Sequence, residues 1–221
     1  MPTTTALLLP LPADRLALRL AVLYGGLALF GASHGLMLLA GLGVPPWDVL
    51  HQGLSRTFGM QVGTWSIVVG ALVLLLWLPL RQRPGLGTLS NVVAVGLGIN
   101  ATLAWVPAPT GWAGRGAFLV AGVLLAAVAT GVYIGAGLGP GPRDGLSTGL
   151  AARGHSLRVV RTTVEVGVLA AGWLLGGTVG AGTLLFALAM GPLTHWAVPA
   201  LRLAPRAPGG AAPGANYASA A

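Results

Sequence analysis

Long apolar runs separated by short polar segments dominate this chain. Five of them reach about 20 residues, the length of a helix that crosses the hydrocarbon core of a bilayer, over residues 20–42, 62–80, 86–106, 117–138 and 180–201. A sixth, weaker run covers residues 157–177 and has charged residues in its first half. We therefore predict an all-α integral membrane protein with about six transmembrane helices, forming a single membrane domain over residues 1–204.

The chain also contains an internal repeat. A shift of 96 positions pairs residues 23–55 with 119–151, and 13 of these 33 pairs are identical. With a shift of 95, residues 85–89 pair with residues 180–184. The pattern predicts two related halves, repeat 1 at about 16–106 and repeat 2 at about 115–201. Each half has three spans and a short helical segment after its first span, so the second half should enter from the opposite side as an inverted repeat.

Composition supports the membrane assignment and gives the orientation. Of 221 residues, 55% are hydrophobic and 7% are charged, whereas soluble domains have about 25% charged residues. With a cytoplasmic N-terminus, ten of the twelve arginines fall on the inner side, and only Arg56 and Arg115 fall outside. This positive-inside bias predicts a membrane protein with both termini cytoplasmic. Residues 205–221, rich in Pro, Gly and Ala, should form a disordered cytoplasmic tail.

Other classes of protein fit poorly. The net charge is +8, but the arginines lie between apolar runs without a basic stripe, so we expect no nucleic-acid partner. The chain has no cysteine, which excludes thiolate metal sites and redox-active thiols. The four histidines lack metal-ligand spacing, and no nucleophile or dinucleotide motif is present. We therefore expect neither an enzyme nor a cofactor.

Two aspartates occupy equivalent positions in the halves. Asp48 and Asp144 each follow a Gly/Pro-rich break and precede a short helical stretch. Each could act as the N-cap of that helix, accepting hydrogen bonds from backbone N–H groups. The helix after Asp48 could lie at the interface as an amphipathic helix. Alternatively, both segments could be re-entrant half-helices whose ends frame a substrate or ion site.

Further polar residues lie within the spans. Glu165 is the acid expected at membrane depth, and Arg161, one turn earlier, is its expected partner. This pair could be a desolvated structural ion pair or a proton- or ion-coupling site. Asn91 and Asn100 could bond between helices or line an asymmetric pocket. Thr88 and Thr183, which follow Gly-x-Gly, should cap the third and sixth spans.

Several motifs resemble a known family. They include Trp47-Asp-Val-Leu-His-Gln-Gly-Leu54, Leu80-Arg-Gln-Arg-Pro-Gly85, Gly141-Pro-Arg-Asp-Gly-Leu146 and Arg158-Val-Val-Arg-Thr-Thr-Val-Glu165. Over about residues 15–200 the chain resembles the YczE/YyaS/YitT family of bacterial membrane proteins. The resemblance implies a multi-pass inner-membrane protein of unestablished activity, and it supplies no catalytic residues. Members called YczE are associated with lipopeptide antibiotic production.

Two functions follow as hypotheses. The leading one is transport or conduction of a small solute or ion, with Asp48, Asp144, Arg161, Glu165, Asn91 and Asn100 as candidate site residues. The alternative is a non-transporting accessory or scaffold protein that supports lipopeptide production or secretion. The lipid bilayer is the expected environment in either case, and a homo-oligomer is compatible with the sequence.

Overall fold

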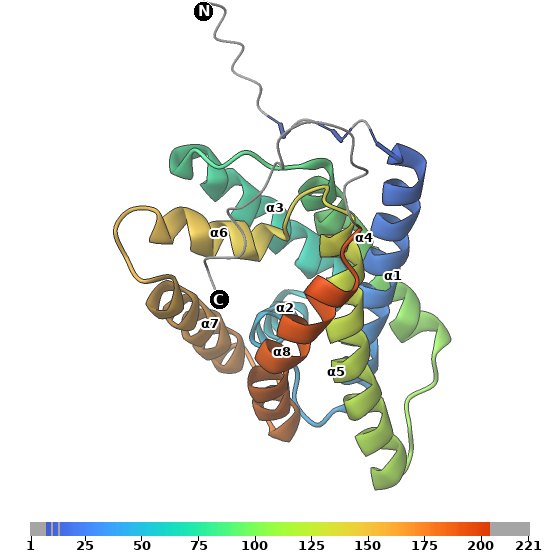
Figure 1. Cartoon of the computed structure of the whole chain (residues 1–221). Coiled ribbons are helices and arrows are strands. Elements are labelled where there is room, and N and C mark those ends of the chain that lie inside the picture. Colours follow the sequence, from blue (N-terminus) through green and yellow to red (C-terminus); the bar gives the residue numbers. More distant parts are fainter. Residues whose placement is uncertain (1–7, 10, 13, 204–221) are drawn as a thin grey trace, which may run out of the picture.

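The computed structural model describes residues 8–9, 11–12 and 14–203 (Figure 1). The predicted tail at 205–221 lies outside this part. The described residues form eight helices and no strand, in the order α1 (Leu16–Ala40), α2 (Pro46–Phe58), α3 (Val62–Leu80), α4 (Leu86–Trp105), α5 (Trp112–Gly135), α6 (Pro142–Ala151), α7 (Leu157–Leu174) and α8 (Ala181–Ala200). The all-α prediction is confirmed, and the six predicted spans correspond to α1, α3, α4, α5, α7 and α8.

Five of these helices are long and apolar enough to cross a membrane, namely α1, α3, α4, α5 and α8. The weaker predicted span, α7, is not among them. It has 18 residues, ends at Leu174 and carries Arg158, Arg161 and Glu165. A helix of this length rises about 27 Å, which is slightly less than the hydrocarbon core of about 30 Å.

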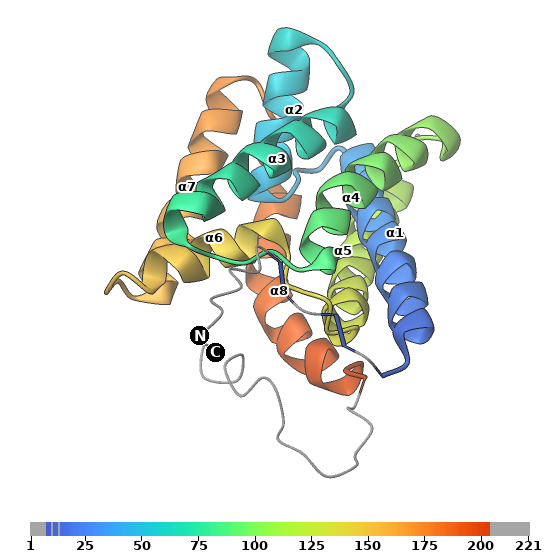
Figure 2. The same ribbon diagram turned by 90° about the horizontal axis from the view of Figure 1, so that it is seen from above.

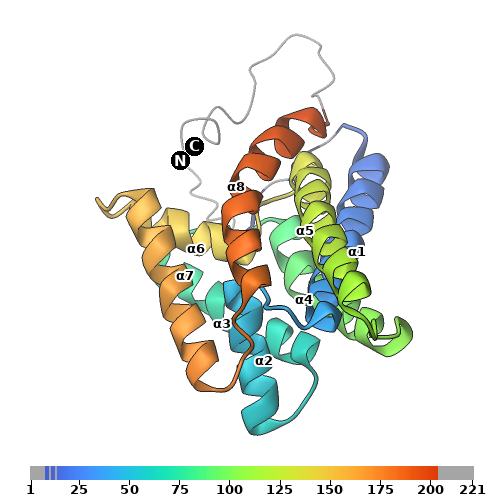
Figure 3. The ribbon, with the colours of Figure 1, turned by 90° about the horizontal axis from the view of Figure 1, so that it is seen from below.

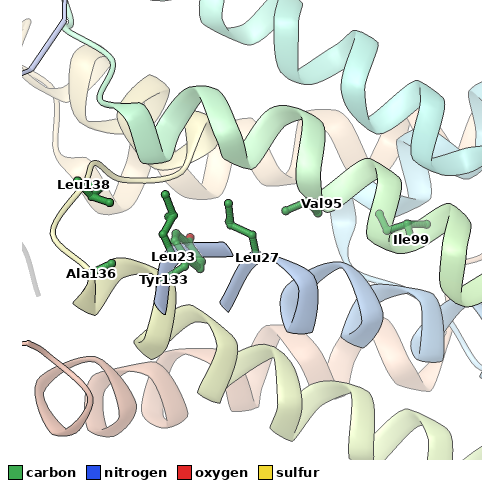
Figure 4. Close-up of a cluster of buried hydrophobic side chains, with 7 residues drawn as sticks. All are labelled: Leu23, Leu27, Val95, Ile99, Tyr133, Ala136 and Leu138. Atoms are coloured by element: carbon green, nitrogen blue, oxygen red, sulfur yellow. The ribbon is translucent and has the colours of Figure 1, made fainter. Parts of the chain in front are cut away.

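The helices α1 and α5 lie side by side, with α4 against α1 and α8 against α5 (Figures 1 and 3). Three of the largest fully buried apolar side chains, Leu23, Leu27 and Ile99, lie where α1, α4 and α5 meet. Figure 4 shows this cluster of Leu23, Leu27, Val95, Ile99, Tyr133, Ala136 and Leu138. It fixes the first helix of each half against the other.

Two short helices, α2 and α6, follow α1 and α5 after tight breaks. Gly41 and Gly137 both have positive φ, of 60° and 70°, a conformation that glycine adopts without strain. Each short helix then begins with proline, Pro46 or Pro142, which suits the first turn because proline lacks an N–H. The first turn of α2 is buried within the protein, so an amphipathic helix lying on a surface does not describe it.

Arginines tie the two halves together in a reciprocal way. The guanidinium of Arg19 donates to the carbonyl oxygen of Ala136 at 2.8 Å. The guanidinium of Arg115 donates to the carbonyl oxygen of Ala40 at 2.7 Å. Arg115 and Ala136 lie 96 positions after Arg19 and Ala40. Each half therefore closes the C-terminal end of the other half's first helix.

The N-terminal ends of α4 and α8 are also linked to the opposite half by hydrogen bonds at equivalent positions. Thr88 accepts a hydrogen bond from the amide three residues earlier, and so does Thr183, so both predicted caps are confirmed. Thr88 Oγ1 then donates to the carbonyl of Pro140, before α6, at 2.8 Å. Thr183 Oγ1 donates to the carbonyl of Val44, before α2, at 2.8 Å. Each threonine thus links its own half to the break in the other.

One contact is not shared by the halves. In the first half α3 packs along α4, whereas the corresponding helices of the second half, α7 and α8, make no comparable contact. Figures 2 and 3 show α6 and α7 at one edge of the molecule, away from α1. The helix α7 packs mainly on α2 instead, where Gly172 and Gly53 bring the backbones close together.

Candidate functional site

A cavity of about 970 Å³ lies at the centre of the molecule, lined by residues from all eight helices or the breaks before them. This volume lies at the upper end of the range of about 300–1,000 Å³ that small-molecule sites occupy. The first turns of α7 and much of α8 line it, and these two helices do not pack along each other. The ionisable residues that line it are His34, Tyr133, Arg143, Asp144, Arg158, Arg161, Glu165 and His195.

The first turns of α2 and α6 meet at this cavity. The guanidinium carbon of Arg143 lies 5.0 Å from the centroid of the Trp47 ring, in cation–π contact. Trp47 and Arg143 are equivalent positions of the two halves. Among the described residues, Arg143 forms no ion pair within 4.0 Å, although it interacts electrostatically with Asp48 and Asp144. Its charge is thus available to a negatively charged solute in the cavity.

A second pair of charges projects from α7. Arg161 Nε lies 3.1 Å from Glu165 Oε1, so the predicted pair at one-turn spacing forms. The side chains are 60% and 40% exposed, and both line the cavity. Arg161 also interacts electrostatically with Asp144. The pair therefore faces the cavity and is not the desolvated pair that one sequence interpretation expected.

Asp48 lies behind the cavity wall and is fully buried. Its Oδ1 accepts a hydrogen bond from His51 Nδ1 at 3.2 Å. Its Oδ2 lies 3.6 Å from Nε2 of His34 on α1 and has no hydrogen-bond partner in the described structure. His34 lines the cavity and Asp48 does not, so the imidazole stands between the carboxylate and the cavity.

The prediction that the two aspartates are N-caps is wrong. Pro45 and Gly141 occupy the N-cap positions of α2 and α6, and neither helix has a side-chain cap. Asp48 and Asp144 are each the third residue of their helix, in the first turn. A carboxylate in that turn is favoured by the helix dipole, but both side chains are directed to other partners or to the cavity.

The two candidate asparagines lie in different environments. Asn91 is buried and lines the cavity. Asn100 lies further along α4, outside the cavity lining, where its Oδ1 accepts from the amide of Gly63 at 2.8 Å and its Nδ2 donates to Thr64 Oγ1 at 3.3 Å. Asn100 thus satisfies backbone at the start of α3, as interhelical packing would require.

Sequence reasoning missed four residues of the site: Trp47, His34, His51 and Arg143. The spacing of Asp48 and His51, three residues apart on one helix, could have signalled their hydrogen bond. Nothing in the sequence indicated that His34, on another helix, would complete the group. No group of three or more His, Cys, Asp or Glu side chains within the described ranges has the geometry of a metal site.

Comparisons with known proteins found related bacterial proteins, one of which is named a membrane protein. An uncharacterised protein of Haemophilus influenzae is 39% identical over 178 residues, covering 80% of this chain and 82% of that protein. The uncharacterised membrane protein YczE of Bacillus subtilis is 36% identical over 190 residues, covering 84% and 88%. YyaS of the same organism is 30% identical over 184 residues, covering 80% and 90%.

The similarity to YczE, which is named a membrane protein, and the long apolar helices identify a multi-pass membrane protein. The predicted resemblance to YczE and YyaS is confirmed. No solved structure matches this chain. The model of a family of unknown function, DUF6198, matches residues 17–199. This chain belongs to that family, and YczE and YyaS of Bacillus subtilis are related to it.

Proposed function

We propose that this protein carries a small charged solute across the bacterial inner membrane through its central cavity. The observation that carries the proposal is the cavity itself, in which Arg143, Asp144, Arg161 and Glu165 face one another among transmembrane helices. Ionisable residues inside a membrane domain are costly and usually mark a substrate or ion pathway. The lining also includes Phe30, Tyr133 and Phe186, so an organic solute with an apolar part fits.

The proposed scaffold is a pair of inverted three-helix repeats with six spans, α7 being the sixth. Arg19 and Arg115 each donate a hydrogen bond to a carbonyl oxygen of the other half, and so do Thr88 and Thr183. This exchange supports a two-fold relation between the halves, because a simple translation would not make each half both donor and acceptor to the other. Three spans per half then require opposite orientations. In secondary transporters of this architecture, substrates bind near the repeat interface at half-helix ends, which is where α2 and α6 begin here.

Alternating access fits the difference between the halves. We take the cavity to be closed where α3 packs along α4 and to open where α7 and α8 do not pack along each other. Since the N-terminal turns of α7 line this opening, the arginine distribution puts it on the cytoplasmic side. We take this arrangement as the inward-facing state, with both termini cytoplasmic. In the outward-facing state, α3 and α4 would separate while α7 and α8 close.

Uptake by proteoliposomes tests the proposal. Purified protein should accumulate at least one class among radiolabelled organic anions, cations and zwitterions above protein-free liposomes. If that class is the anions or the zwitterions, Arg143→Gln should lower its uptake at least about tenfold, because a hydrogen bond to a charged group contributes about 1.5–3 kcal/mol and about 1.4 kcal/mol is tenfold in affinity. Uptake of cations alone would contradict a binding role for Arg143. The control is Arg83→Gln, an equal change of charge at an exposed position between α3 and α4.

Flux equal to that of protein-free liposomes for every class, from protein that remains folded, would overturn the transport proposal. The non-transporting accessory or scaffold role would then be the better explanation of the protein's function. Equal loss of uptake in Arg83→Gln and Arg143→Gln would also count against the cavity as the binding site.

A further inference from the structure

The Asp48 carboxylate is held between two imidazoles in a way that leaves hydrogen-bonding capacity unused. Asp48, His34 and His51 are each almost completely buried. Asp48 Oδ2 and His51 Nε2 are the buried side-chain atoms without a hydrogen-bond partner in the described part of the chain. Buried polar atoms are rarely left unpaired, since this costs about 1–3 kcal/mol each, so this group calls for a chemical explanation.

The hydrogen-bond network assigns the tautomer of His34. Ser33 Oγ donates to the carbonyl oxygen of Phe30 at 2.6 Å. His34 Nδ1 lies 2.9 Å from the same carbonyl oxygen and 3.1 Å from Ser33 Oγ. Because a carbonyl only accepts and the serine proton is already used, Nδ1 must carry the hydrogen. In the neutral ring, Nε2 then presents a lone pair.

Two acceptors therefore face each other across 3.6 Å, Nε2 of neutral His34 and Oδ2 of ionised Asp48. One added proton converts this contact into a hydrogen bond, whether it resides on the nitrogen or on the oxygen. The other imidazole is a poorer site for that proton. His51 already donates from Nδ1 to Asp48, and a second hydrogen on its Nε2 would be buried without an acceptor.

We propose that one exchangeable proton binds between Asp48 and His34, and that its binding favours an anionic solute at Arg143. The second part rests on the proposed transport function. His34 lines the cavity and gives the proton access to Asp48. In the second half, the positions of His34 and His51 are occupied by Thr130 and Ser147, so the proton site belongs to the first half alone.

Charge links the two sites. The groups that act electrostatically on Asp48 are His34 from α1, His51 from α2 and Arg143 from α6. Those that act on His34 are Asp48 and Arg143. The helices α3, α5, α7 and α8 add no charged group to either set within the described ranges. Neutralising the Asp48 charge leaves Arg143 less compensated, which strengthens its attraction for an anion. By thermodynamic linkage, the anion equally strengthens proton binding.

Proton counting on the purified protein in lipid nanodiscs tests the first part without any flux measurement. A pH-indicator dye reports the protons taken up as the pH is lowered from about pH 8, the upper end of the ordinary histidine range, to the lowest pH at which the protein stays folded. Asp48→Asn and His34→Gln should each take up one proton fewer than wild type, and the double variant should lose no more than either. His155→Gln, at an exposed loop position, is the control, and it should leave the loss caused by Asp48→Asn unchanged.

Additive losses in the Asp48 and His34 variants, or unchanged counts, would overturn the shared proton. If either variant fails to fold, ¹⁵N NMR of histidine-labelled wild type decides the matter. The Nε2 resonance of His34 should move over the same pH range, and an invariant resonance would contradict the proposal.

The coupling is tested with acetate, inorganic phosphate and citrate, and with choline as the cationic control. At fixed pH at least one anion should increase proton uptake by wild type. Arg143→Gln should abolish that increase and should itself move the resting proton uptake to higher pH, because it removes a positive charge that acts on Asp48 and His34. If no anion changes the count, the coupling is wrong. Because these counts need no transport, a failed proteoliposome screen would not contradict them. Likewise, a failure of the proton counts would not contradict measured uptake by proteoliposomes.

Discussion

The paired residues of the two halves have similar backbone positions and different chemistry. Asp48 and Asp144 are both third residues of short helices, yet one is enclosed by imidazoles and the other lines the cavity. Trp47 and Arg143 are likewise equivalent, and they contact each other. A duplicated scaffold has thus acquired one site, built from unlike side chains at equivalent positions.

Glu165 carries a prediction at this scale. Because its ion pair with Arg161 is exposed to the cavity, the pair should contribute only about 0.2–1 kcal/mol to stability. Glu165→Gln and Arg161→Gln should therefore shift the thermal unfolding of the detergent-solubilised protein very little, while altering solute uptake. A stability loss of about 3–5 kcal/mol, typical of one partner removed from a buried pair, would show that the pair is desolvated in the membrane.

The helices α1 and α5 depend on small residues where they contact each other. A Cβ atom added at Gly26 of α1 would lie 2.7 Å from the Tyr133 backbone nitrogen on α5, and one added at Gly122 of α5 would lie 2.6 Å from Met37 on α1. Gly122 and Tyr133 lie 96 positions after Gly26 and Met37, so each half makes the equivalent contact with the other half. Small residues at such crossings let backbones approach closely, which drives helix packing in lipid.

Neighbouring glycines in α1 give a matched test of this packing. Gly26→Ala should destabilise the protein by about 1–3 kcal/mol, because rigid backbone stands in the way of the new methyl group. Gly25→Ala, with nothing within 4 Å of the added Cβ, should be neutral or slightly stabilising, since alanine favours helix. Reversible unfolding in detergent measures both. Equal effects of the two substitutions would mean that α1 and α5 are not packed as described.

At the scale of the whole molecule, the orientation of the halves remains a prediction. The chain has no cysteine, so single cysteines can be introduced without background. A membrane-impermeant thiol reagent added to intact cells should label Thr110→Cys, between α4 and α5. It should not label Arg83→Cys or His155→Cys, which are equally exposed in the isolated protein. Labelling of Arg83→Cys from outside would contradict the six-span topology and the inversion.

Sequence patterns predicted the helices well and the site only in part. Hydropathy placed α3 at its observed bounds and the other spans within a few residues, because membrane helices must satisfy their backbone internally. The threonine caps followed from local spacing. The contact between His34 and Asp48 could not be predicted, because it depends on how α1 and α2 pack after the break at Gly41. The contact of Arg143 with Trp47 likewise depends on how the two halves meet.

The reciprocal bonds of Arg19 and Arg115 bear on how such a chain could arise. In the proposed topology one of these arginines is cytoplasmic and the other lies outside, where arginine opposes the usual charge asymmetry. Arg115 nevertheless has a use there, since it holds the end of α1. A single ancestral three-helix chain that inserted in both orientations would have needed this arginine in every copy, because each copy closed the first helix of its partner. If the proposed inversion holds, the present polypeptide contains the interface of such an antiparallel dimer within a single chain.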